Sequence, residues 1–94
     1  MQFSVFKESV RHNTLPADIS IYLQAMWYDG RDDWDKAHSL VDSLTDFTAS
    51  RVHAYLHRKE GDIWNADYWY RKAGRKRPDI TLAEEWEMIV KDLL

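Results

Sequence analysis

The sequence predicts an all-α protein built from antiparallel helical hairpins, and three observations support this class. Apolar residues recur at helical spacings of three and four along most of the chain, and no stretch alternates with the period of a strand. The three glycines and two prolines fall near the ends of these helical stretches. The stretches are joined by short intervals, which place consecutive helices side by side and antiparallel. The 94 residues are therefore expected to form one helical domain.

The N-terminal part of the chain predicts a docking segment followed by a longer helix. Residues 1–13 should form a short helix that docks on the body, because three apolar residues are spaced i, i+3 and i+7: Phe3, Phe6 and Val10. The next helix is expected to start at Pro16, which suits a first helical turn. It should run to about Tyr28, and Gly30 should end it.

The capping and turn residues of the central region predict two helical hairpins. In the first hairpin, residues 15–45, Asp32 or Asp33 caps the second helix, which should run through about Leu44. The second hairpin, residues 46–78, turns at Gly61, with Asp46 or Thr48 capping its first helix and Asp62 its second. Each hairpin is expected to bury the apolar faces of its helices against each other.

Residues 81–94 predict a final helix that caps the stack of hairpins. Pro78 cannot continue the preceding helix, since it lacks a backbone N–H and its ring would clash. Thr81 and Glu84 have the spacing of a capping box, which starts a new helix. One face of this helix is apolar: Leu82, Trp86, Ile89 and Leu93.

The second hairpin resembles a tetratricopeptide repeat. The pattern consists of small, turn, aromatic and terminating residues separated by seven, five, four, three and five positions: Ala54, Gly61, Ala66, Tyr70, Ala73 and Pro78. The two alanines let the helices approach closely, and Pro78 ends the unit. The first hairpin is a degenerate copy, because Ala37 precedes Ala66 by 29 residues instead of the family's roughly 34. The resemblance covers about residues 19–94.

A second resemblance rests on two short motifs. The stretch His53-Ala-Tyr-Leu-His-Arg-Lys-Glu-Gly-Asp62, followed by Tyr68-Trp-Tyr-Arg71, is similar to a family of short uncharacterised proteins from bacteria and fungi. It covers most of the chain and implies no activity.

Composition excludes several classes of function. The net charge of −3 argues against an extended nucleic-acid footprint. The absence of cysteine excludes disulfides and thiolate metal sites. The apolar runs are too short to cross a membrane, and residues 1–10 do not have the pattern of a signal peptide. We therefore expect a cytoplasmic protein that contacts neither nucleic acid nor membrane.

One candidate site is a groove for a protein partner. The tetratricopeptide resemblance implies that the first helix of each pair lines a concave surface. On a helical wheel, basic and aromatic residues lie opposite the apolar stripe of residues 49–60, and the preceding unit can contribute a polar residue: Arg51, Tyr55, Arg58, Lys59 and Gln24. Arginine and tyrosine suit an acidic peptide segment. The leading hypothesis is therefore a non-enzymatic protein-interaction module. Homo-oligomerisation is a further possibility, because Trp64 and Tyr68 lie off the core stripe of their helix.

The alternative candidate site is a histidine cluster. His53 and His57 are spaced i, i+4, so both imidazoles can reach one ion, with Glu60 or His38 completing the set. This pattern indicates a site for a divalent metal such as zinc, in a binding protein or a small histidine-based enzyme. A hydrogen-bonded network without a cofactor, holding two helices together, explains the same residues.

Overall fold

Six α-helices and no strands make up the protein, described for all residues 1–94 by a computed structural model. The prediction of an all-α protein is therefore confirmed. The helices are α1 (Phe3–Arg11), α2 (Ile21–Gly30), α3 (Trp34–Val41), α4 (Phe47–Lys59), α5 (Ile63–Lys72) and α6 (Leu82–Leu93). None of them is long and apolar enough to cross a membrane.

Side chains cap most of the helices as their sequence signals predict. Asp33, Asp46 and Asp62 each accept a hydrogen bond from a backbone N–H in the first turn of α3, α4 and α5. Thr81 and Glu84 form the predicted capping box of α6. These caps satisfy N–H groups that have no partner inside the helix.

Two predicted helix boundaries are wrong. Pro16 lies outside any helix, and α2 begins at Ile21 with Ser20 as its cap. The reason is Asp18, whose φ of +59° is left-handed and cannot belong to an α-helix. The following helix, α3, ends at Val41 instead of about Leu44.

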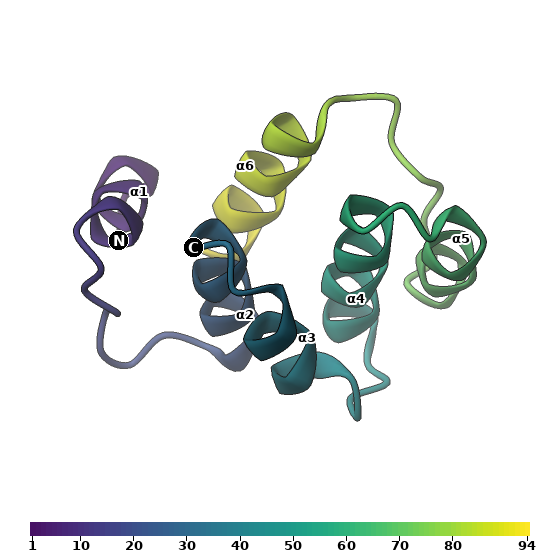
Figure 1. Cartoon of the computed structure of the whole chain (residues 1–94), viewed down its shortest axis with the longest axis horizontal. Coiled ribbons are helices and arrows are strands. Elements are labelled where there is room, and N and C mark those ends of the chain that lie inside the picture. The colour runs from purple at the N-terminus through teal and green to yellow at the C-terminus, as the bar shows by residue number, and fades with distance from the viewer.

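Helix α4 lies at the centre of the fold and contacts α2, α3, α5 and α6 (Figure 1). All nine residues from Ala49 to His57 are buried, although they include polar side chains. On one side α4 packs against α5 through Ala54, Ala66 and Tyr70, as the spacing of the second hairpin predicts. On the other side it joins the main core cluster, which includes Val52 and Leu56.

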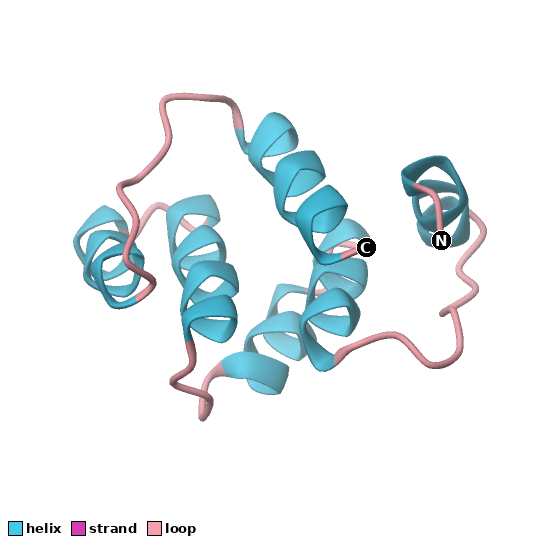
Figure 2. Cartoon of the chain, turned by 180° about the vertical axis from the view of Figure 1, so that it is seen from behind, coloured by secondary structure: helices cyan, strands magenta, loops and turns pink.

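The N-terminal and C-terminal helices, α1 and α6, contact the rest of the fold on the side away from α5. Figure 2 shows α6 crossing back over α2 after the loop that follows α5, with α1 at the edge of the molecule. Trp86 of α6 donates from Nε1 to the carbonyl of Met26 at 3.0 Å. Helix α1 docks through Phe6 and Val10, which are buried in the core cluster. The tetratricopeptide-like stacking of the hairpins stays a prediction.

Candidate metal centre

The predicted peptide groove does not form an exposed face. Tyr55 is 2% exposed and Arg51 is 6% exposed, because α2 and α6 cover the side of α4 that the helical wheel assigns to solvent. Arg51 donates from Nη1 to Asp92 of α6 at 2.8 Å. Gln24 lies apart from this group and donates to the carbonyl of Ile19 at 3.1 Å. The prediction that these residues share a solvent-facing surface is wrong.

Two buried carboxylates accept hydrogen bonds from α4. Asp29 is 1% exposed and accepts from the Tyr55 hydroxyl at 3.0 Å and from Lys59 Nζ at 2.9 Å. Burial, together with the Asp29 carboxylate, raises the pKa of the Tyr55 hydroxyl far above its usual range. Tyr55 therefore remains a hydrogen-bond donor, and it joins α2 to α4.

The second buried carboxylate, Glu85, joins three helices. It is 1% exposed and lies between Arg58 of α4, whose Nη1 donates at 2.7 Å, and Tyr70 of α5, whose hydroxyl lies 2.7 and 2.9 Å from the two oxygens. Burial, followed by the hydrogen bond to Glu85, raises the pKa of the Tyr70 hydroxyl far above its usual range. Arg58 and Lys59 are thus partners of internal carboxylates.

The predicted histidines do come together. His38 of α3 meets His53 and His57 of α4, and one nitrogen from each of the three rings lies within 4.8 Å of the other two. His38 Nε2 and His53 Nε2 are 3.0 Å apart. His53 and His57 are buried at 4% and 7% exposure, whereas His38 is partly exposed. The i, i+4 spacing stacks the two α4 rings with 4.6 Å between their centroids.

One carboxylate is hydrogen-bonded to the outer nitrogen of His57, and a second lies near that of His38. His57 Nδ1 lies 2.6 Å from Glu60 Oε1, and His38 Nδ1 lies 3.9 Å from Asp42 Oδ2. In His57 the Glu60 carboxylate favours the tautomer with the proton on Nδ1, so Nε2 is the nitrogen with a lone pair for a ligand. Glu60 is therefore better placed to orient His57 than to ligate an ion together with it. The side-chain nitrogen of Asn65 lies 3.3 Å from His57 Nε2.

Two tryptophans enclose the histidines. Trp34 stacks on His38 with 4.8 Å between ring centroids, and Trp69 stacks on His53 at 4.0 Å. Trp34 is itself fixed, because its Nε1 donates to the Leu56 carbonyl at 2.8 Å. Their stacked rings restrict the rotation of the imidazoles and exclude water from one side of each.

His53 carries two features that matter for its chemistry. Desolvation, followed by the repulsion of positive charge on His57 and His38, lowers its pKa to about 4. His53 is therefore neutral near pH 7, the state that binds metals. Its buried Nδ1 has no hydrogen-bond partner. The cluster is thus not the fully paired network that the cofactor-free explanation requires.

Sequence reasoning found the three histidines but missed what surrounds them. Asp42 stands four residues after His38, and Asn65 and Trp69 lie on α5. The i, i+4 spacing of His38 and Asp42 was a usable signal. The other two depend on how α5 packs against α4. Comparison of the chain with protein-family models, curated proteins and solved structures finds no match.

Proposed function

We propose that this protein binds one divalent transition-metal ion of the zinc class through His38, His53 and His57. The observation that carries the proposal is the convergence of three imidazoles, each with one nitrogen within 4.8 Å of the others. Imidazole is a preferred donor for Zn²⁺, Ni²⁺ and Cu²⁺, and three histidines are a sufficient protein ligand set for zinc.

The spacing of the nitrogens suits tetrahedral coordination. With Zn–N bonds of about 2.0–2.1 Å, two ligand nitrogens lie roughly 3.4 Å apart. His38 Nε2 and His53 Nε2 need to separate by a few tenths of an ångström from their present 3.0 Å. The ligand nitrogen of His57 needs to approach the other two nitrogens by no more than about 1.5 Å, a movement that a side-chain rotation can supply. Such a rotation of His57 would break its contact with Asn65.

The surroundings favour binding over catalysis. A cavity of about 610 Å³ is lined by residues of α1, α2, α4 and α6, and it includes none of the three histidines. An ion at the cluster would join α3 to α4 and replace the hydrogen bond between His38 and His53 by bonds to the metal. The predicted protein-interaction function stays a prediction, and the burial of Arg51 and Tyr55 gives it no support.

Zinc binding to purified protein tests the proposal. Protein freed of metal by chelator and dialysed at pH 7.5 should take up one Zn²⁺ or Ni²⁺ by isothermal titration calorimetry and elemental analysis. His57→Gln should lose this stoichiometric binding, because glutamine is a poor ligand. The matched control is His12→Gln, which alters the fourth histidine, an exposed residue paired with Glu8 outside the cluster.

The same measurements can refute the proposal. Absence of uptake by the wild type, or equal uptake by the wild type and His57→Gln, would contradict it. Binding should also weaken as the pH falls through the histidine range, since protons compete with the ion for imidazole nitrogens.

A further inference from the structure

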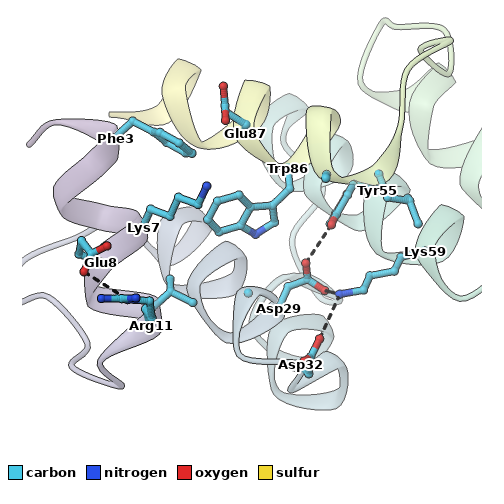
Figure 3. A pocket seen from close by; sticks show the side chains of 14 residues that line it. Phe3, Lys7, Glu8, Arg11, Asp29, Asp32, Tyr55, Lys59, Trp86 and Glu87 are labelled. Carbon is cyan, nitrogen blue, oxygen red and sulfur yellow. Dashed lines mark hydrogen bonds and ion pairs between the residues drawn. The ribbon is translucent and has the colours of Figure 1, made fainter.

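A second site lies on the opposite side of α4 from the histidines. A cavity of about 610 Å³ is bounded by residues of α1, α2, α4 and α6. This volume is within the range of roughly 300–1,000 Å³ that small-molecule sites occupy. Figure 3 shows its two ends, with Phe3, Lys7 and Arg11 of α1 at one and the Asp29–Tyr55–Lys59 network at the other.

Aromatic side chains form the middle of this cavity. Trp86 is partly buried and lies against the backbone of Gly30, where an added Cβ would stand 3.0 Å from the indole. Phe3 meets Trp86 edge to face with 5.9 Å between centroids. Leu82, one turn before Trp86 on α6, adds an apolar side chain to the lining. A flat aromatic ring can pack against such a wall in the offset or edge-to-face geometry that aromatic pairs prefer.

Most charged side chains of the lining have an ion-pair partner. Glu8 pairs with Arg11 at 3.4 Å, and Glu87 pairs with Lys91 at 2.9 Å. At the far end, Lys59 lies 2.9 Å from Asp29 and 3.9 Å from Asp32.

Lys7 is the one charged residue of the lining with no ion pair and no hydrogen bond. Its side chain extends from α1 toward the Trp86 indole (Figure 3). An ammonium group beside an aromatic wall is suited to an anion attached to a ring.

We propose that this cavity binds a small planar aromatic carboxylate, with its ring against Trp86 and Phe3 and its carboxylate paired with Lys7. The buried Asp29 does not compete for the role of charge partner, because both of its oxygens already accept hydrogen bonds. An aromatic amine in the same position would place its positive charge beside Lys7 and should bind more weakly. The proposal is independent of the metal centre, whose residues lie on another face of α4.

The test uses 2-naphthoate as the probe, with 2-naphthylmethanol and 2-naphthylmethylamine as uncharged and cationic controls. A ligand of this size in an open cavity should bind with a Kd on the order of 1 mM, which suits a chemical-shift titration by NMR. The Trp86 indole N–H signal should shift, and the carboxylate should bind more tightly than the alcohol or the amine. Lys7→Met should weaken 2-naphthoate binding about fivefold, the upper value for an exposed ion pair, and leave alcohol binding unchanged.

The matched control variant is Lys76→Met. Lys76 is an exposed lysine in the loop between α5 and α6, away from the cavity, so this variant should bind the carboxylate as the wild type does. Equal binding of the carboxylate and the alcohol, equal binding by Lys7→Met and the wild type, or no shift at Trp86 would each overturn the proposal. Both substituted lysines are exposed, so both variants should fold.

Discussion

Lowering the pH from 7 to 5 should destabilise the folded protein by about 2 kcal/mol through His53 alone. The pKa of this imidazole falls from its ordinary 6.5 to about 4 on folding. Between these two values the unfolded chain binds a proton that the folded protein excludes, so acid favours unfolding. The stability is present above pH 6.5 and is lost as the pH falls toward 4, by which point the loss reaches about 3 kcal/mol.

Urea unfolding at pH 7 and pH 5, with chelator present, measures this loss. For a protein of this size, about 2 kcal/mol should lower the midpoint by roughly 1–2 M urea. His53→Gln should remove most of the difference between the two pH values, whatever its own stability at pH 7. His12→Gln should retain the wild-type difference. An equal fall in stability for the wild type and His53→Gln would refute the assignment to His53.

Two further predictions concern the packing of α5. Tyr70→Phe should lower the free energy of unfolding by about 1–3 kcal/mol, because the buried Glu85 loses the one hydroxyl donor that its two oxygens share. Thermal melts check this, and an unchanged melting temperature would show that Tyr70 does not stabilise Glu85. Ala66→Trp should lower the free energy of unfolding by about 1–3 kcal/mol or more, because the larger side chain overpacks the fully buried contact with Ala54. A melting temperature equal to that of the wild type would contradict the close packing of α4 and α5.

Local signals in the sequence were sufficient to predict most helix starts. Asp46, Asp62 and Thr81 act within one turn of the residues that they cap, so their effect can be read from neighbouring positions. The predicted helix start at Pro16 was wrong because proline itself suits a first helical turn, whereas the left-handed backbone at Asp18 prevents a helix there. Nothing local in the sequence marks that turn as clearly as a glycine would.

The burial of α4 could not be read from its own sequence. A helical wheel separates polar from apolar faces, but it does not show how many neighbours surround a helix. Tyr55 and Arg51 are polar and still lie inside, because α2 and α6 bring acidic side chains to them. The histidines were easier to predict, since two of them share one helix and the third lies on the preceding helix. Their tryptophan neighbours depend on tertiary packing.

The hydrogen bond from Trp86 to Met26 joins residues that are 60 positions apart in the chain. Helices α4 and α5, by contrast, are adjacent in sequence and can pack with little loss of chain entropy. We therefore expect this local hairpin to form first and α6 to dock late. Ile89 and Val90 are the α6 residues buried in the core cluster. If α6 docks late, substitutions at these two residues should mainly accelerate unfolding, whereas changes at Ala54 should slow folding.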